Sequence, residues 1–360
     1  MKGLLKYLPH IILLIFTLSR TVQNKTRKAE GEPCECQFQR CICKYLSDCK
    51  VLYDRKDIDY CNRKHGLVCC PQEPKTPNIT PAELASEFAC QKYTEMISND
   101  CAREFITGGE LARAKEFPPA ALVGRFIMET KKHDWFCGGT LISERFVLTA
   151  SHCTKAGVIN RVRLGDLDFS SNKDDEGVQE FSVSQVISHS QYDRYDSYND
   201  IMLLELNGTV TFTDYVQPAC LLTPSRTVYN NSVFWAVGWG AVDHSTNMSP
   251  QLRRVQLRKL ENCGPVATEA YNLLRGLRER TQFCAHGETN DTCRGDSGGP
   301  LLITFPSKEE KYKCLYMVAG IISKGQIECG SQDIPSLNTN VTAFVRFIEY
   351  HVWPTKNNKS

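Results

Sequence analysis

The stretch Cys293-Arg294-Gly295-Asp296-Ser297-Gly298-Gly299-Pro300 lies towards the C-terminus of this 360-residue chain. A serine between small residues on a tight loop can present its hydroxyl outward, while the backbone N–H groups of Gly295 and Ser297 converge on one point. Two converging N–H groups stabilise a tetrahedral oxyanion, and the small residues let a substrate carbonyl approach closely. The stretch therefore predicts a nucleophile, Ser297, and an oxyanion hole formed by Gly295 and Ser297.

A serine hydroxyl is a poor nucleophile until a base removes its proton, so the same stretch predicts a histidine and a carboxylate elsewhere. His152 follows the run Leu148-Thr149-Ala150-Ser151, and Asp200 precedes the apolar run Ile201-Met202-Leu203-Leu204. Taken alone, a histidine is usually structural, and such an aspartate usually marks the end of a strand. Together with Ser297 they predict a catalytic triad of His152, Asp200 and Ser297, in that order along the chain.

Residues 106–360 resemble a chymotrypsin-fold serine protease, because the order His, Asp, Ser is the order of that family. Three framework motifs carry the resemblance further: Ile106-Thr107-Gly108-Gly109, Phe136-Cys137-Gly138-Gly139 and Ala236-Val237-Gly238-Trp239-Gly240. The resemblance implies an all-β fold, a chymotrypsin-like double six-stranded β-barrel with the triad in the cleft between the barrels.

The hydrophobic pattern agrees with an all-β domain. Short, partly alternating apolar runs are separated by turns, and they occupy Arg145–Leu148, Val162–Leu164, Phe181–Ile187, Ile201–Leu206, Val233–Val237 and Met317–Ile322. The C-terminal end differs, because its apolar residues recur at helical intervals. These are Val341, Phe344, Val345, Ile348 and Val352. The sequence therefore predicts a C-terminal amphipathic helix that packs on the barrel.

A cysteine-rich segment, residues 34–70, contains eight of the 18 cysteines: Cys34, Cys36, Cys41, Cys43, Cys49, Cys61, Cys69 and Cys70. So short a segment cannot bury a stable core by itself, so disulfides must stabilise it. The spacing from Cys43 to the pair Cys69-Cys70 resembles the clip domain of arthropod serine proteases. Two of Cys34, Cys36 and Cys41 exceed that family's pattern, and the pairing stays open; a generic disulfide knot is the alternative. A clip domain implies docking to partner proteins.

The resemblance also implies disulfides for the rest of the chain. Within the protease domain they are Cys137–Cys153, Cys263–Cys284 and Cys293–Cys329, and Cys90–Cys220 would tether the light chain to the heavy chain. Cys101 and Cys314 remain and could pair by elimination. Residues 71–105 begin with a proline-rich run, typical of an extended linker, followed by a short helix over Ala82–Tyr93.

The Ile106 motif implies a zymogen. Cleavage before Ile106 would free an ammonium group that pairs with Asp296 in the interior and orders the oxyanion loop. The residue before Ile106 is Phe105 rather than arginine or lysine, which is similar to a subset of clip proteases with a nonbasic activation site. The alternative is a cut after Arg103, followed by trimming of the two residues that would otherwise block insertion.

The substrate pocket is predicted from the resemblance. Asp291 stands where trypsin-like members have the carboxylate that selects arginine or lysine, since it can pair with a desolvated guanidinium. Ser323 and Gly325 resemble pocket-wall residues. Three positions depart from the family: Ser336 replaces a glycine and is expected to narrow the pocket, Asn338 replaces a tyrosine, and Lys324 replaces an aromatic residue.

The remaining features concern location and partners. Residues 1–23 resemble a signal peptide: they are basic at the start and then apolar over Ile11–Leu18, too short a run to span a bilayer. The 18 cysteines fit an oxidising compartment, so we expect a secreted, extracellular protein with no membrane partner. Sequons at Asn24, Asn78, Asn207, Asn230 and Asn247 are compatible with glycosylation.

Charge and acidic clusters suggest little beyond this. A formal net charge of +2 gives no nucleic-acid footprint. The basic clusters Arg253–Lys259 and Arg275–Arg280 are interpreted as solvated faces rather than as an anion-binding exosite. No cofactor or metal is expected, although the acidic residues near Asp166 and Asp168 could form a calcium loop.

Three functional hypotheses follow. The first is a secreted serine endopeptidase zymogen of a haemolymph cascade in immunity, melanisation or patterning. Its partners would be an upstream activating protease, a downstream protease zymogen or pro-ligand, and a serpin-type inhibitor. The second is a weakly active or non-catalytic clip-domain homologue that serves as cofactor or scaffold; the intact triad argues against it. The third is a digestive protease, which has no evident use for a clip-like module.

Overall fold

The computed structural model describes most of the chain. The described residues are 33–36, 39–45, 60–62, 67–71, 84–96, 110–173, 175–192, 194–195, 197–224, 232–242, 248–271, 273, 276–287, 291–306, 315–325 and 334–354. The predicted signal peptide, Phe105 and Ile106 lie outside them. The chain divides into two compact units, Met1–Ile79 and Thr80–Ser360, and each is described by itself.

The first unit is a four-stranded antiparallel sheet with the strand order β1-β2-β4-β3. Its strands are β1 (Pro33–Cys36), β2 (Gln39–Tyr45), β3 (Tyr60–Asn62) and β4 (Leu67–Pro71). A disulfide between Cys43 and Cys61 joins strands β2 and β3, and Cys43 is fully buried. Because a sheet of this size has little core, the cross-link supplies part of its stability, as predicted for a clip domain.

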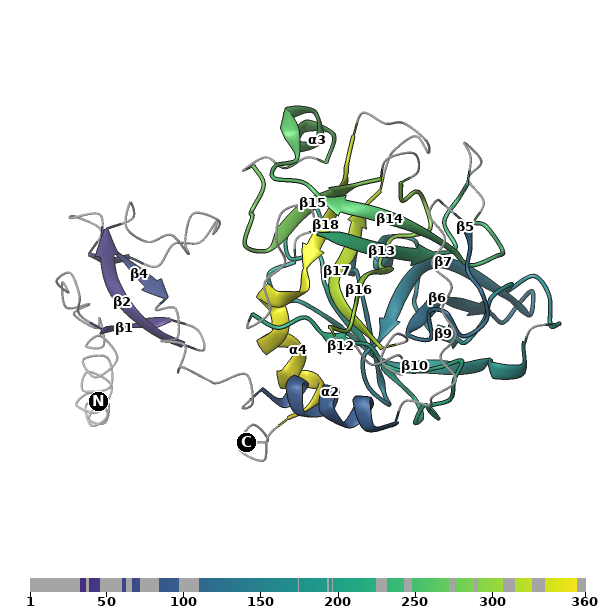
Figure 1. Ribbon diagram of the computed structural model, residues 1–360. Coiled ribbons are helices and arrows are strands. Elements are labelled where there is room, and N and C mark those ends of the chain that lie inside the picture. The colour runs from purple at the N-terminus through teal and green to yellow at the C-terminus, as the bar shows by residue number, and fades with distance from the viewer. Residues whose placement is uncertain are drawn as a thin grey trace, which may run out of the picture. The chain divides into compact units, whose positions relative to one another are not determined.

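The second unit begins with a closed antiparallel barrel (Figure 1), in which the strands follow the order β10-β11-β8-β7-β6-β9. Its strands are β6 (Ala120–Ile127), β7 (Lys132–Leu141), β8 (Phe146–Thr149), β9 (Arg161–Leu164), β10 (Gln179–Ser188) and β11 (Met202–Leu206). In β9 the side chains of Val162 and Leu164 are buried and those of Arg161 and Arg163 are not. This alternation follows from the two-residue period of a strand, which sends every second side chain into the barrel.

Six strands of the C-terminal half form a second ring. Strand β17 pairs with both β16 and β18, which closes the path β17-β16-β13-β14-β15-β18. Its strands are β13 (Val233–Gly238), β14 (Arg253–Lys259), β15 (Gln282–His286), β16 (Pro300–Thr304), β17 (Tyr316–Lys324) and β18 (Ser336–Asn340). Two short strands join its outside, β12 (Cys220–Leu221) along β17 and β5 (Glu110–Leu111) along β14. The predicted double six-stranded barrel is confirmed.

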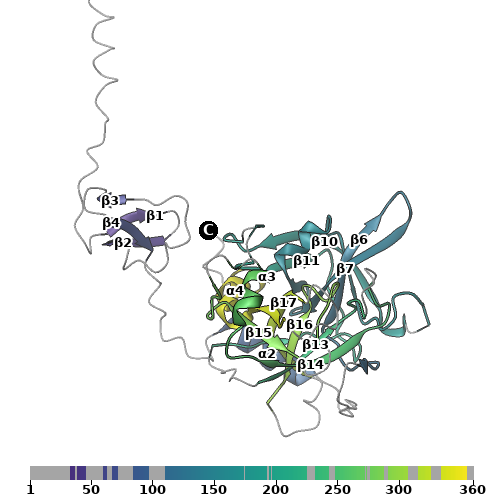
Figure 2. The same ribbon diagram turned by 90° about the horizontal axis from the view of Figure 1, so that it is seen from above.

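Among the described residues, the helices lie at the periphery of the barrels (Figure 1 and Figure 2). They are α2 (Ala85–Met96), α3 (Gly264–Ala270), α4 (Val345–Val352) and the 3₁₀ turns η4 (Ser151–Lys155), η5 (Asp175–Gly177) and η7 (Val341–Phe344). Helix α4 confirms the predicted C-terminal helix, with Val345 and Ile348 buried. Helix α2 lies beside it (Figure 1), where the backbone N–H and hydroxyl of Ser86 both donate to Glu349.

The largest buried cluster extends from the interior of the first barrel into the contact between the barrels. Leu122, Leu148 and Leu204 fill the first barrel, and Trp235, Val237 and Val318 of the second barrel belong to the same cluster. A second cluster fills the other barrel and includes Ala89 and Tyr93 of α2. The largest cluster therefore packs the two barrels against each other, while the second barrel also has a cluster of its own.

Candidate active site

The position of His152 is set by the residues on either side of it. It lies on turn η4, directly after strand β8. The hydroxyl of Ser151 donates to the carbonyl oxygen of Ile201 at 2.7 Å, and Cys153 forms a disulfide with Cys137 of β7. The residues that flank His152 thus anchor the turn to strand β7 and to Ile201, the residue before strand β11, so the imidazole has little freedom to move.

Asp200 accepts hydrogen bonds from three groups. Its carboxylate accepts from the backbone N–H of His152 (2.8 Å), from Nδ1 of the same imidazole (2.7 Å) and from the hydroxyl of Ser323 (2.6 Å). The side chain is 1% exposed. Burial alone would raise the pKa of Asp200, but the charge of His152 and these hydrogen bonds outweigh it and hold the pKa below the usual value. An ionised carboxylate at Nδ1 leaves Nε2 as the nitrogen that can accept a proton.

The loop that carries Ser297 is pinned against the same strands. The carbonyl oxygen of Ser297 accepts from the N–H of Gly138 at 2.8 Å and lies 3.8 Å from Cys153 Sγ. A ring nitrogen of His152 lies within 4.8 Å of that sulfur. The loop and the histidine therefore meet at one place, although 145 residues separate Ser297 from His152 in the sequence.

Two glycines make the approach of this loop feasible. Gly295 and Gly298 have φ angles of +95° and +78°, in the region that disfavours other residues. A Cβ atom on Gly298 would lie 2.2 Å from Thr149 Oγ1, so only glycine fits against β8. Gly298 thus lets the loop pack directly against β8.

Asp296 lies buried behind the loop. Its carboxylate accepts from the N–H groups of Gly240 (2.8 Å) and Cys293 (2.9 Å). Burial is the main cause that raises the pKa of Asp296 to about 6. Both of these hydrogen-bond donors are neutral, and the charge of Arg253 does not outweigh burial, so an additional positive charge would stabilise the ionised carboxylate further. Its predicted partner, the amino group of Ile106, lies outside the described residues.

Asp291, the predicted pocket residue, is also buried, with a side chain 2% exposed. It accepts from the backbone N–H of Thr292 at 2.6 Å, and His286 Nδ1 lies 3.0 Å from its other oxygen. Burial is the main cause that raises the pKa of Asp291, against the opposing effect of these donors. The sequence interpretation missed His286, although a titratable residue only five positions before Asp291 was a signal that could have been followed.

Ser336 and Asn338 form a polar group next to this pair. The Ser336 hydroxyl donates to the carbonyl of Ala285 at 2.9 Å, and the Asn338 amide donates to Ser336 Oγ at 3.1 Å. Both side chains are fully buried. The Ser336 hydroxyl, which the sequence predicts to narrow the pocket, is therefore hydrogen-bonded to the backbone of strand β15.

Two other predicted pocket residues have different surroundings. The Ser323 hydroxyl bonds to Asp200, so it supports the triad, a link across 123 residues with no local sequence signal. Gly325 contributes its carbonyl, which accepts from Tyr271 at 3.3 Å. Lys324, between them, is largely buried; desolvation lowers its pKa, and Asp200 and Lys155 act on it electrostatically.

A groove of about 760 Å³ adjoins the oxyanion loop. Gly295, Arg294 and Met248 line it on one side, and Trp135 and Phe136 of β7 line it as well. A hollow of this size can hold a segment of extended polypeptide next to Gly295, although no triad residue is in its described lining.

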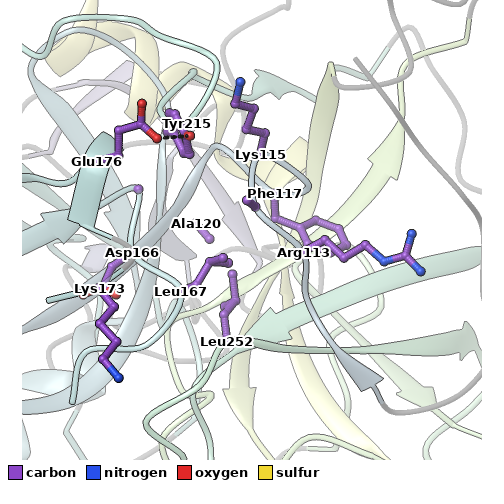
Figure 3. Close-up of a pocket in the computed structure, with 12 residues that line it drawn as sticks. Arg113, Lys115, Phe117, Ala120, Asp166, Leu167, Lys173, Glu176, Tyr215 and Leu252 are labelled. Carbon is purple, nitrogen blue, oxygen red and sulfur yellow. Dashed lines mark hydrogen bonds between the residues drawn. The ribbon is translucent and has the colours of Figure 1, made fainter. Parts of the chain in front are cut away.

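A smaller cavity, of about 220 Å³, has no triad residue in its lining. Figure 3 shows Tyr215 hydrogen-bonded to Glu176 and, elsewhere in the lining, Asp166. The Asp166 carboxylate accepts from Arg163, and Asp168 accepts from the N–H and hydroxyl of Ser170. A guanidinium thus supplies positive charge to Asp166. Calcium at this loop stays a prediction.

The structure describes the disulfides Cys43–Cys61, Cys90–Cys220, Cys137–Cys153 and Cys263–Cys284. Three are pairs that the resemblance implied: Cys90–Cys220, Cys137–Cys153 and Cys263–Cys284. Cys293 is disulfide-bonded, but its predicted partner Cys329 lies outside the described residues, as do Cys101 and Cys314. Within the described ranges, every helix falls short of the length and apolarity that a bilayer-spanning segment requires.

Comparison with known proteins agrees with this geometry. Residues 106–348 match the trypsin family. The chain therefore belongs to the trypsin family of serine proteases, and it is a serine endopeptidase by fold and family.

Its relatives narrow the group further. Serine protease ea of Drosophila melanogaster is 30% identical over 86% of this chain and 88% of its own. CLIP domain-containing serine protease HP8 of Bombyx mori is 31% identical over 78% and 79%. Phenoloxidase-activating factor 1 of Holotrichia diomphalia is 28% identical over 97% of this chain and 100% of its own. The chain is thus a clip-domain protease of the arthropod type.

Proposed function

We propose that this protein is a secreted zymogen that, once cleaved before Ile106, acts as an endopeptidase in an extracellular cascade. The observation that supports it most is the set of bonds from His152 and Ser323 to the Asp200 carboxylate, beside the loop of Ser297. This is an arrangement for nucleophilic catalysis by a serine.

Each residue has a defined role in the proposed mechanism. His152 Nε2 takes the proton of the Ser297 hydroxyl as the serine attacks the peptide carbonyl, and it then returns the proton to the leaving amine. Asp200 holds the tautomer and stabilises the imidazolium. The N–H groups of Gly295 and Ser297 stabilise the oxyanion.

Activation is proposed at the bond between Phe105 and Ile106. The new ammonium of Ile106 would pair with Asp296. Burial raises the pKa of this carboxylate, so a positive partner would stabilise its ionised form. Because Phe105 is not basic, the upstream protease would not be trypsin-like. The alternative remains a cut after Arg103 with subsequent trimming.

The cascade role rests on relatives. Their names include Phenoloxidase-activating factor 1, Spaetzle-processing enzyme and Proclotting enzyme, each of which refers to the processing or activation of another protein or to a precursor form. We propose that this chain cleaves a protease zymogen or pro-ligand after arginine or lysine, that residues 34–70 dock partners, and that a serpin-type inhibitor ends its activity.

The experiment uses full-length protein with residues 102–105 replaced by Ile-Glu-Gly-Arg, so that a sequence-specific protease exposes Ile106. Peptides varied at the residue before the scissile bond are then assayed, with Ser297→Ala as the control. We expect cleavage after arginine and lysine, and a loss of about 10²–10³-fold in kcat/KM for them in Asp291→Asn, since a buried charge partner is removed. Activity no higher than that of Ser297→Ala would instead favour the scaffold hypothesis.

A further inference from the structure

A histidine contacts Asp291, the predicted specificity carboxylate, and its position has a consequence for selectivity. His286 Nδ1 lies 3.0 Å from Asp291 Oδ2, and the side chains are 27% and 2% exposed. Thr292 occupies the other oxygen, Oδ1, with its backbone N–H at 2.6 Å and its hydroxyl at 3.3 Å. Both oxygens of the predicted specificity carboxylate therefore already accept hydrogen bonds.

Strand β15 fixes the imidazole in this place. His286 is its last residue, and the preceding residue, Ala285, pairs with Ser336 of β18. The Ser336 hydroxyl donates to the Ala285 carbonyl, and Asn338 donates in turn to Ser336. The disulfide Cys263–Cys284 anchors the strand two residues earlier. The histidine is thus held by a rigid strand.

A guanidinium binds a carboxylate best through two parallel hydrogen bonds, one to each oxygen. Here an arginine side chain that enters the pocket meets oxygens that already accept from His286 and Thr292. The backbone N–H of Thr292 cannot be displaced, because Thr292 directly follows Asp291 in the sequence. A substrate guanidinium must therefore displace the His286 imidazole from Asp291 Oδ2 or share that oxygen with it.

We propose that His286 is a specificity-determining residue, which reduces the advantage of arginine and lysine over uncharged side chains of the same shape. This inference rests on the proposed function, in which Asp291 receives the substrate side chain. On this inference, Ser336 and Asn338, which depart from the family pattern, hold the strand that carries His286. The protease should accept an uncharged substrate residue before the scissile bond better than other trypsin-like enzymes do.

The test compares two peptides that differ only in arginine or citrulline before the scissile bond, since citrulline has nearly the shape of arginine without its charge. The activated full-length chain is assayed as wild type, His286→Ala and His286→Phe; the second variant keeps a ring but removes the donor. We expect the arginine-to-citrulline ratio of kcat/KM to rise about tenfold in both variants. A structural disturbance would lower both rates and leave the ratio unchanged.

His351→Ala is the matched control, because the ring of His351 contacts Phe347 and Tyr350 of α4. Labelling of Ser297 by a fluorophosphonate, which reacts without an arginine-like group, reports whether each variant folds and activates. Suppose that labelling is normal and that wild type cleaves after arginine. An arginine-to-citrulline ratio of kcat/KM within twofold of wild type in both variants would then overturn the proposed role of His286 and leave the proposed function intact. If Ser297 is labelled but no protein cleaves the arginine peptide, the proposed primary specificity fails and the inference fails with it.

Discussion

Two histidine–aspartate pairs lie among the described residues of the protease domain, and the same kinds of atom meet in both. In the triad, His152 Nδ1 lies 2.7 Å from Asp200, which also accepts from the backbone of the same histidine and from Ser323. In the pocket, His286 Nδ1 lies 3.0 Å from Asp291, which also accepts from Thr292. In the proposed function, the first pair directs a base at the serine, and the second pair occupies the carboxylate that would bind the substrate side chain.

The pairs differ in what surrounds the carboxylate. For Asp200 the donors and the charge of His152 outweigh burial and lower the pKa, whereas for Asp291 burial outweighs them and raises it. The same two residue types can therefore hold a carboxylate firmly ionised or leave its charge costly to maintain. Residue identity alone does not assign a role; the number and strength of the donors do.

The largest effect should come from breaking the first pair. Asp200→Asn cannot hold the imidazole in the required tautomer, so we expect kcat to fall about 10⁴-fold. Steady-state hydrolysis of a peptide by the activated chain measures it. Asp214→Asn, which removes a carboxylate that pairs with Lys115 at a more exposed position, is the control and should leave kcat within twofold. A loss below tenfold in Asp200→Asn would contradict the proposed role.

Asp296 is a third buried carboxylate, and the donors described for it are backbone N–H groups rather than a histidine. Its pKa of about 6 in the folded chain exceeds the ordinary 3.8, so the folded state binds the proton more tightly than the unfolded state. The stability it contributes is fully present below about pH 4 and is lost as the pH rises through 6. We expect about 3 kcal/mol from this group in the uncleaved chain.

Thermal unfolding at pH 4.5 and pH 8, values chosen to lie on either side of about pH 6, measures that effect. Uncleaved Asp296→Asn should gain several degrees in Tm over wild type at the higher pH and little at the lower. After cleavage before Ile106 the sign should reverse, because the ammonium then stabilises the ionised carboxylate. An equal Tm difference at both pH values would show that the carboxylate charge is not responsible.

The smallest effect should come from removing one donor of the first pair. Ser323→Ala deletes the hydroxyl 2.6 Å from Asp200 but leaves both bonds to His152 in place. We expect kcat to fall about tenfold with KM nearly unchanged, since a hydrogen bond to a charged group is lost. Ser143→Ala, which removes a buried hydroxyl that accepts from Arg145 and Phe146, should lower Tm without lowering kcat. Equal kcat values for the two variants would show that the Ser323 hydroxyl does not help to position Asp200 for catalysis.

Much of the fold follows from the sequence. All six predicted apolar runs form strands, because the interior of each barrel selects alternating or continuous apolar residues. Strand β14 shows where the pattern fails. The sequence predicts a solvated basic face for Arg253–Lys259. In the structure, however, Arg254 is buried, paired with Glu116 and stacked against Trp235. A buried ion pair across 138 residues has no local signature.

The site shows the same limit. Ser297, His152 and Asp200 are predictable because chemistry requires those residue types together. The hydroxyl of Ser323 and the ring of His286 are placed by strands β17 and β15, so their contacts depend on how the second barrel closes. Sequence reasoning assigned Ser323 to the pocket wall and did not consider His286, because a position in a motif does not say where a side chain points.

The disulfide Cys90–Cys220 has a further consequence for where the enzyme acts. Cys90 precedes the bond between Phe105 and Ile106, and Cys220 follows it, so a cut there leaves the two pieces covalently joined. A surface that binds the N-terminal unit would then hold the mature protease nearby, at a local concentration of about a millimolar for a short flexible connection. Substrates near that surface would be cleaved first, so the activity of this protein would be limited in space as well as in time.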